Sequence, residues 1–230
     1  MRIVKLLAAG AVAAVLAYYP VAAEQAQQDA DKKVAGGGIT VKGWMGKEDA
    51  GNRQNLTIND AKLAPEGKGM RVQTGPAALY WNPANVGKGD FSVKATFTEP
   101  KQSYDHPHPY GVFIGGANLD TAPSALYCVA YRNGTYIVRG FSGGKPFRVV
   151  AKPAPNDAVK KAAADAEVVQ DVAINVRGDK VECTINGATV WSGTKADVVG
   201  EGKLASTDGI TGIRVSHNSD AIVTGFAVGK

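Results

Sequence analysis

The sequence predicts an all-β protein, a sandwich of two antiparallel sheets, and three features lead to this expectation. Asn133-Gly134 and Asn186-Gly187 each stand between two segments of strand character, and Asn-Gly tolerates the positive φ of a two-residue hairpin turn. Apolar and polar residues alternate through 91–98 and again through 172–177, as in half-buried strands. Strands with one apolar face each must bury those faces, and two stacked sheets are the usual solution.

The first 23 residues predict a signal peptide. Arg2 and Lys5 precede the uncharged stretch 6–17, and Val21-Ala22-Ala23 suits cleavage before Glu24. The stretch is shorter than the roughly 20 apolar residues that a membrane span needs. We therefore expect a periplasmic or secreted protein with no membrane span after cleavage.

The mature chain is expected to hold one domain. Residues 24–38 are polar and end in three glycines, which predicts a flexible lead-in. Residues 39–230 then form a single β-sandwich domain, because roughly 200 residues suit one such unit. The net charge of +5 includes Arg2 and Lys5, and without a sustained basic stripe nucleic acid is not an expected partner. No oligomeric state is indicated.

The expected elements follow one another along the chain. Strands are predicted at 91–98, 110–114, 126–131, 136–141, 145–150, 172–177, 181–185, 188–192, 212–216 and 221–228. The segment 156–169, with Asp157 near its start and a Lys-Lys-Ala-Ala-Ala run, interrupts this pattern. It predicts one short helix on a connection.

A two-residue turn at Asn133-Gly134 would place Tyr131 opposite Tyr136 and Cys128 opposite Arg139. Directly opposed residues share a face of the sheet. One face would hold Tyr127, Val129, Tyr131, Tyr136 and Val138, and the other Cys128, Ala130, Arg132, Ile137 and Arg139. Either face could be the core. The tyrosines could be buried with both arginines in solvent, or they could point outward as a stacking platform for sugar rings.

The second hairpin is less ambiguous. Its apolar face holds Val181, Cys183, Ile185, Ala188 and Val190. Trp191 then lies opposite Glu182 on the other face, where the pair is a candidate sugar contact. The alternative is an aromatic ring covered by a loop or by the sheet edge.

Cys128 and Cys183 are the two cysteines of the chain, and in an exported protein they could form a disulfide. Because Cys183 faces the core, pairing would require Cys128 to face inward, with Tyr127, Tyr131 and Tyr136 outside. Two free thiols would favour buried tyrosines, since free cysteine is often buried.

The ordered segments 90–97, 110–114, 181–190, 212–216 and 224–228 resemble the concanavalin A-like lectin/glucanase sandwich. Within it the chain is most similar to bacterial domains of the 3-keto-disaccharide hydrolase type, over roughly 39–229. The resemblance implies a jelly-roll fold that binds or acts on saccharides, commonly on the concave sheet. The retaining-glucanase motif Glu-x-Asp-x-x-Glu does not occur, and neither does the clustered Asp and Asn set of legume-lectin metal sites.

The segment 104–110 is the densest cluster of functional side chains, with Tyr104, Asp105, His106 and His108. A proline after each histidine favours extended backbone, which would project both imidazoles to one side. Such side chains could ligate a metal, but a loop with its path set by prolines explains them without one. We interpret the cluster as part of a saccharide-site rim. His217 is interpreted as a structural or turn residue.

The expected function is an exported, non-catalytic saccharide-binding protein with no metal and no cofactor. Its ligand-binding candidates are Tyr104, Asp105, His106, His108, Tyr127, Tyr131, Arg139, Glu182 and Trp191. One alternative is a glycoside hydrolase of the 3-keto-disaccharide type that draws on Asp105, His106, His108 and Glu182. A further alternative is an adhesion or protein-interaction module that uses a sheet face.

Overall fold

Alternating burial along the strands produces two stacked sheets with a core between them. In β6 (Phe91–Glu99) every second residue from Phe91 is buried, and the same pattern recurs in β12 (Val168–Arg177). The computed structural model describes residues 30–52 and 54–230, and residues 31–230 form one compact unit. The predicted signal peptide, residues 1–23, lies outside the described residues.

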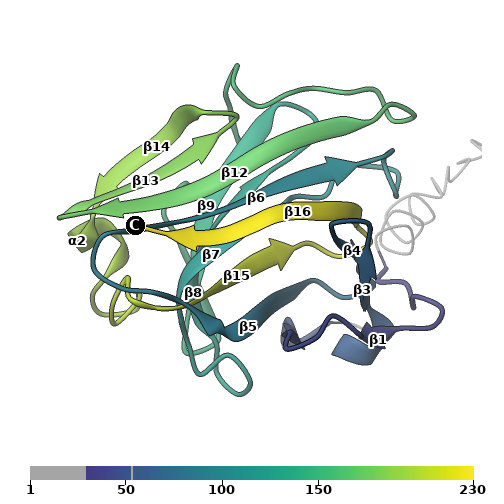
Figure 1. Ribbon diagram of the computed structural model, residues 1–230, viewed down its shortest axis with the longest axis horizontal. Coiled ribbons are helices and arrows are strands. Elements are labelled where there is room, and N and C mark those ends of the chain that lie inside the picture. The colour runs from purple at the N-terminus through teal and green to yellow at the C-terminus, as the bar shows by residue number, and fades with distance from the viewer. Residues whose placement is uncertain (1–29, 53) are drawn as a thin grey trace, which may run out of the picture. The chain divides into compact units, whose positions relative to one another are not determined.

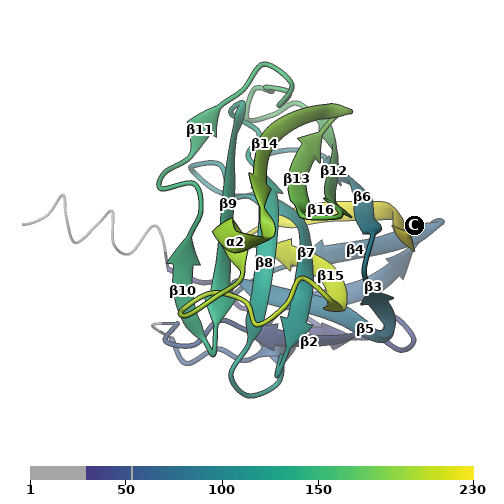
Figure 2. The same ribbon diagram turned by 90° about the vertical axis from the view of Figure 1, so that its left-hand side faces the viewer.

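Each sheet contains eight strands, and Figures 1 and 2 show them as two layers. Sheet 1 runs in the order β1 (Gly38–Ile39), β3 (Lys62–Glu66), β4 (Gly69–Gln73), β16 (Asp220–Gly229), β6, β12, β13 (Lys180–Ile185), β14 (Ala188–Thr194). Sheet 2 runs in the order β10 (Lys145–Arg148), β9 (Thr135–Ser142), β8 (Ser124–Ala130), β7 (Tyr110–Ala117), β15 (Gly209–Val215), β5 (Ala78–Gly87), β2 (Met45–Glu48), and β11 (Ala154–Pro155) also pairs with β9. A 3-10 turn, η1 (Ile58–Asp60), and the helix α2 (Lys195–Val198) lie on connections. The all-β jelly-roll sandwich predicted from the sequence is confirmed.

A disulfide joins the two sheets through the core. It links Cys128 of β8 to Cys183 of β13, with the Cα atoms 6.1 Å apart and a sequence separation of 55. Both side chains are fully buried. Cys128 therefore faces inward, the orientation that pairing was expected to require.

The first hairpin has a register one residue away from the predicted one. Ala130 pairs with Tyr136 and Cys128 with Val138, whereas Tyr131 opposite Tyr136 was expected. Of the two turn residues only Gly134 has a positive φ, 87°, so the turn is not the predicted type I′. The Asn133 side chain accepts hydrogen bonds from the Thr135 backbone and hydroxyl, which favours a longer loop.

The slip separates tyrosines that were expected to share a face. A one-residue shift exchanges the faces of one strand relative to its partner. Tyr136 consequently lies in the core between the sheets, whereas Tyr127 and Ile137 lie on the outer face of sheet 2. Arg132 is buried rather than solvent-exposed, and its guanidinium pairs with Glu99 at 3.0 Å.

The second hairpin has the predicted two-residue turn, with Asn186 at φ 51° and Gly187 at φ 84°. A β-bulge at Cys183/Thr184 then shifts the register, since a bulge sets two residues of one strand against one of the other. Trp191 consequently lies opposite Cys183 rather than Glu182, and it packs partly buried against the core.

The helix predicted over 156–169 is wrong. The segment after β11 is irregular up to β12. Its Ala163 and Ala166 carbonyls accept hydrogen bonds from the buried Arg132 guanidinium, and Gln170 bonds the backbone of Lys160 in both directions. Tertiary partners thus take the backbone groups that a helix would use internally. The short helix lies instead at α2.

The residues before Ile39 add contacts that the prediction of a flexible lead-in did not include. Val34 N donates to Asp60 O at 2.9 Å, and Lys32 N donates to Asn218 Oδ1 at 2.9 Å. These bonds bring Asp31 and Lys32 beside the turn that follows β15. Among the described residues, no helix has the length and apolar character that crossing a bilayer requires.

Candidate functional site

The outer face of sheet 2 carries its own buried aromatic and aliphatic cluster, separate from the core between the sheets. Its members alternate with core residues along β5, β7, β8 and β9. They are Leu79, Trp81, Phe113, Leu119, Ala125, Tyr127, Val129 and Ile137, with Tyr131, Phe141, Val150 and Ile210 partly buried around them. An aromatic and apolar surface is thus present on the side of the sheet that faces away from sheet 1.

An ion pair sits on this outer face. Arg214 of β15 donates from Nη1 and Nη2 to the two carboxylate oxygens of Asp49, at 2.5 and 2.6 Å. The guanidinium carbon lies 5.4 Å from the Tyr127 ring centroid and 5.5 Å from that of Phe141. Burial opposes the charged form, but the Asp49 carboxylate raises the pKa of Arg214 above its ordinary value. Arg214 is therefore a fixed cation beside the aromatic rings.

Arg139 of β9 is the second cation of the face. Its Nη2 donates to the Ala151 carbonyl at 3.3 Å, and its buried Nε has no hydrogen-bond partner among the described residues. Burial raises the pKa of the neighbouring Tyr127 and Tyr131 hydroxyls. Both phenols therefore stay protonated and can donate or accept hydrogen bonds.

All three histidines of the chain converge at one end of this face. His106 and His108 come from the loop between β6 and β7, and His217 comes from the turn between β15 and β16. The ring centroids of His106 and His108 are 4.4 Å apart, and those of His108 and His217 are 4.3 Å apart. Tyr104 stacks on His108 at 5.7 Å with an interplanar angle of 24°.

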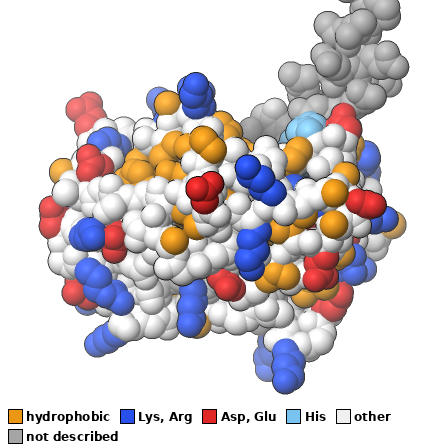
Figure 3. Space-filling model, turned by 90° about the horizontal axis from the view of Figure 1, so that it is seen from above, with side chains coloured by type: hydrophobic (Ala, Val, Ile, Leu, Met, Phe, Trp, Pro, Cys, Tyr) orange, Lys and Arg blue, Asp and Glu red, His pale blue; other side chains and the backbone are white. Residues whose placement is uncertain are grey.

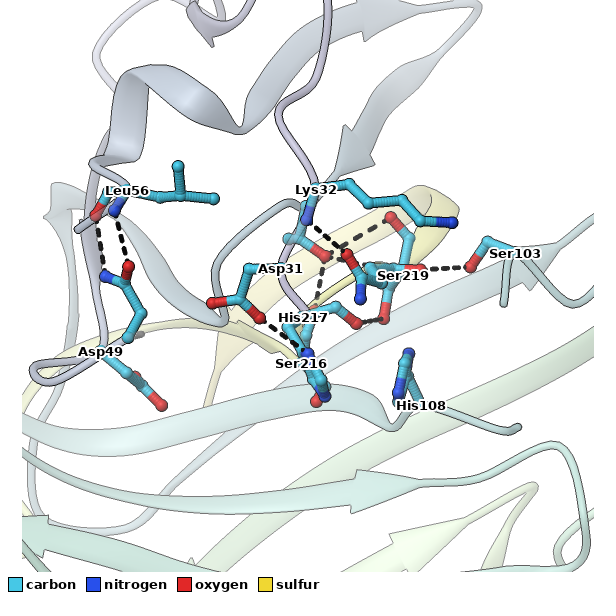
Figure 4. Close-up of polar contacts among 12 residues, drawn as sticks. Asp31, Lys32, Asp49, Leu56, Ser103, His108, Ser216, His217 and Ser219 are labelled. Carbon is cyan, nitrogen blue, oxygen red and sulfur yellow. Dashed lines mark hydrogen bonds and ion pairs between the residues drawn. The ribbon is translucent and has the colours of Figure 1, made fainter. Parts of the chain in front are cut away.

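Two carboxylates orient two of the imidazoles. Asp105 Oδ1 lies 2.6 Å from His106 Nδ1, and Asp31 Oδ1 lies 2.8 Å from His217 Nδ1. Figure 4 shows His217 between Asp31 and His108. A carboxylate at Nδ1 favours the tautomer with the proton on that nitrogen, so Nε2 of each ring is left as an acceptor.

The histidines and the arginines surround one pocket of about 320 Å³. Its lining residues are His106, Pro107, His108, Pro109, Tyr127, Val129, Tyr131, Ile137, Arg139, Arg214, Ser216 and His217. Acidic and basic side chains are interspersed over the face drawn in Figure 3, where histidine atoms also reach the surface. The lining of the pocket thus combines aromatic and aliphatic side chains with polar and charged ones, the combination that small-molecule sites use.

Most of the predicted binding residues come together here. His106, His108, Tyr127, Tyr131 and Arg139 line the pocket. Tyr104 and Asp105 contact its histidines.

Glu182 and Trp191 do not join them, because both lie on strands of sheet 1. Glu182 forms an ion pair with Lys180, with 2.7 Å between Oε1 and Nζ. Trp191 packs against the core as described above. These two residues lie outside the pocket.

Four acidic, basic or imidazole side chains of the site were not among the predicted ones, namely Asp31, Asp49, Arg214 and His217. Asp31 and His217 are 186 residues apart in the sequence, and Asp49 and Arg214 are 165 apart. The pairing of β2 with β5 and of β5 with β15 brings Asp49 to Arg214, and the bond from Lys32 N to Asn218 brings Asp31 to His217. The sequence held one local signal for His217. The chain has only three histidines, and two of them were already placed in the candidate site.

No family model and no curated protein matches the sequence. The fold is similar to that of carbohydrate-binding module CBM66 from Bacillus subtilis, with a TM-score of 0.57 and 9% identity over 84% of this chain and 99% of that one. It is also similar to a Bacillus subtilis protein of unknown function with a galectin-like fold, with a TM-score of 0.55 and 14% identity over 82% and 90% of the two chains.

An endo-beta-1,3-glucanase from Pyrococcus furiosus is a third similar structure, with a TM-score of 0.51 and 11% identity over 84% of this chain and 90% of that one. At such identities the likeness concerns the fold. The chain therefore has a β-sandwich of the galectin and concanavalin A-like kind.

Proposed function

We propose that this chain is an exported saccharide-binding β-sandwich and that the pocket on the outer face of sheet 2 is its binding site. The observation that carries the proposal is the composition of this pocket. Tyr127, Val129 and Ile137 give the pocket an aromatic and aliphatic lining, which suits the C–H face of a sugar ring. Arg139, Arg214 and the histidines surround it with groups that can hydrogen-bond hydroxyls.

The fold supports the same proposal. A carbohydrate-binding module and a glucanase are among the structures with a similar sandwich. A fold shared with such proteins does not itself define an activity, so the proposal depends on the pocket and the fold is additional support.

Export is the second part of the proposal. The segment 1–23 has the basic start, apolar stretch and small-residue end of a signal peptide. The buried Cys128–Cys183 disulfide supports export, because disulfides persist mainly in oxidising compartments. Mass spectrometry of the protein recovered outside the cytoplasm tests this part. We expect the mass of a chain that begins at Glu24.

A hydrolase of the 3-keto-disaccharide type is the second candidate function. The two carboxylate–histidine pairs, Asp105–His106 and Asp31–His217, favour it. A histidine held by a carboxylate at the edge of a pocket is a suitable general base. In this candidate, His217 replaces Glu182 among the chemically active residues, because Glu182 lies on the other sheet.

Calorimetry of the mature protein against a panel of disaccharides and polysaccharides tests both candidates. Heat that saturates at fixed stoichiometry means binding, and heat that continues in proportion to enzyme means hydrolysis. If no saccharide of the panel produces heat and the protein binds another protein, the interaction-module alternative is supported and the saccharide proposal is rejected.

Two variants locate the site. Tyr127→Ala removes an aromatic ring that lines the pocket, and Trp191→Phe is the control, because Trp191 is an aromatic residue outside the pocket. We expect Tyr127→Ala to weaken binding by at least about tenfold, which corresponds to about 1.4 kcal/mol. Trp191→Phe should leave it unchanged. The opposite result would place the sugar on sheet 1.

A further inference from the structure

We infer that His106, His108 and His217 form a binding site for a single divalent transition-metal ion of the zinc class. One potential ligand atom from each residue lies within 4.8 Å of the other two. The residues are the only three histidines in the sequence, and they come from two connections that are about a hundred residues apart. This inference concerns the metal alone and does not depend on saccharide binding.

The nitrogen that each ring presents favours metal binding. A carboxylate lies at Nδ1 of His106 and of His217, so Nε2 is the nitrogen that each of these rings would turn to an ion. Nε2 of His106 lies 2.9 Å from Nε2 of His108. Two nitrogens bound to one tetrahedral Zn²⁺ at about 2.0–2.1 Å are roughly 3.3–3.4 Å apart. The two rings are in hydrogen-bond contact, and their nitrogens would separate by only about 0.4 Å to hold the ion.

The carboxylates supply the outer shell that metal-binding histidines usually have. A histidine ligand commonly donates its second ring N–H to a carboxylate, which fixes the tautomer and makes the coordinating nitrogen more basic. Asp105 and Asp31 occupy these positions for His106 and His217. They also place two negative charges beside the ion without using them as direct ligands.

The loop structure restricts two of the three ligands. Pro107 and Pro109 follow His106 and His108 directly, and proline limits the conformations of the residue before it. His108 is buried and its ring stacks on Tyr104. His106 is half exposed, with 46% of its side chain accessible, so it can move by the roughly 1–2 Å needed to complete the coordination.

Three imidazole ligands leave at least one coordination position open. The three histidines line the pocket of about 320 Å³, so the open position is available to water or to an oxygen of a pocket ligand. Imidazole nitrogen selects zinc, copper, nickel and iron over the hard cations magnesium and calcium.

Zinc titration of the mature, untagged protein tests the inference without any sugar. The sequence suits this test because both cysteines are joined in the disulfide and no other histidine occurs. After treatment with a chelator, we expect Zn²⁺ to saturate at one equivalent and Mg²⁺ to give no heat. The chemical shifts of the three histidine imidazoles should change during the same titration and stop changing at one equivalent of Zn²⁺.

Two variants and one matched control assign the site. His217→Ala removes a ligand, and we expect more than about 100-fold weaker zinc binding. Asp31→Asn should weaken binding by about 10- to 100-fold, as loss of an outer-shell partner does. Asp157→Asn is the control, because Asp157 is an exposed aspartate on the irregular segment between β11 and β12, and it should bind zinc as the wild type does.

Far-UV circular dichroism establishes that each variant is folded. If His217→Ala does not fold, Asp31→Asn and the imidazole NMR signals decide the question. Absence of zinc binding by the wild type, or equal binding by the wild type and Asp31→Asn with unmoved imidazole signals, would overturn the inference. Loss of sugar binding alone would leave it standing.

Discussion

Asp31 Oδ1 lies 2.8 Å from Nδ1 of His217, although the two residues come from nearly opposite ends of the sandwich sequence. The contact joins the segment before β1 to the turn between β15 and β16. It also orients a ring that lines the pocket. A residue that the sequence places in a polar lead-in thus takes part in the candidate site.

The tautomers of the histidines provide the first prediction. In the wild type, His106 and His217 should carry their proton on Nδ1, because a carboxylate accepts from that nitrogen in each ring. Long-range ¹H–¹⁵N spectra of the metal-free protein report this directly. Asp31→Asn should reduce the preference at His217 and leave that of His106 unchanged. An unaltered His217 signal would contradict the contact.

Removal of the disulfide is the second prediction. Cys128→Ala/Cys183→Ala should lower the free energy of unfolding by about 4 kcal/mol, since the bond closes a loop of more than 50 residues in the unfolded chain. Urea denaturation with and without a reductant measures it. Reduction of the wild type should produce a similar loss, and equal stability of the oxidised and reduced proteins would refute the role of the bond.

The third prediction concerns the buried ion pair. Arg132 and Glu99 have 1% and 5% of their side chains exposed, and Tyr110 donates to the second Glu99 oxygen at 3.2 Å. Arg132→Met leaves the Glu99 carboxylate buried and uncompensated, so we expect a loss of about 3–5 kcal/mol in the free energy of unfolding.

A surface pair serves as the control for that prediction. Arg71 pairs with Asp220 at 2.8 Å, with 34% of the Arg71 side chain exposed. Arg71→Met should cost no more than about 1 kcal/mol, because solvent screens exposed pairs. The double variant Arg132→Met/Glu99→Gln should recover part of the loss. Equal costs for the two single variants would contradict the burial argument.

Alkaline pH provides the fourth prediction. Burial raises the pKa of Tyr110, Tyr127 and Tyr131 above the ordinary value of 10.0. Above pH 10 the unfolded chain loses phenol protons that the folded chain retains, so the free energy of unfolding should fall as pH rises through this range. Urea denaturation between pH 8 and 11, with phenolate absorbance at 295 nm, checks it. Ionisation of these tyrosines near 10 in the folded protein would contradict their burial.

Local turn chemistry explains which parts of the fold were predictable. Asn186-Gly187 adopts the predicted turn because both residues take positive φ and the strands meet directly at Ile185 and Ala188. Asn133-Gly134 is the same dipeptide, but its backbone has partners elsewhere. Gly134 O accepts a hydrogen bond from Asn156 N, and Asn133 forms an isolated β-bridge with Lys161. Those partners are distant in the sequence, so the one-residue shift of this hairpin was not readable from the turn.

The candidate site likewise contains residues that local sequence predicted and residues that only the strand arrangement brings together. His106 and His108 lie two residues apart and share a side of one loop, which their spacing and the prolines indicated. His217 and Arg214 required the neighbouring strands to be placed first, because the pairing of β15 with β7 brings them beside the loop that carries His106 and His108. Trp191 was misplaced by one bulge, a feature that no residue pattern in β13 and β14 revealed.

The most direct test of the account is a two-dimensional NMR titration that follows the histidine imidazole and tryptophan indole signals while saccharides are added. The account predicts that a binding saccharide shifts the signals of His106, His108 and His217, because all three line the pocket, and leaves the Trp191 indole unmoved. A shift of Trp191 with stationary histidines, or no shift with any saccharide of the panel, would contradict it.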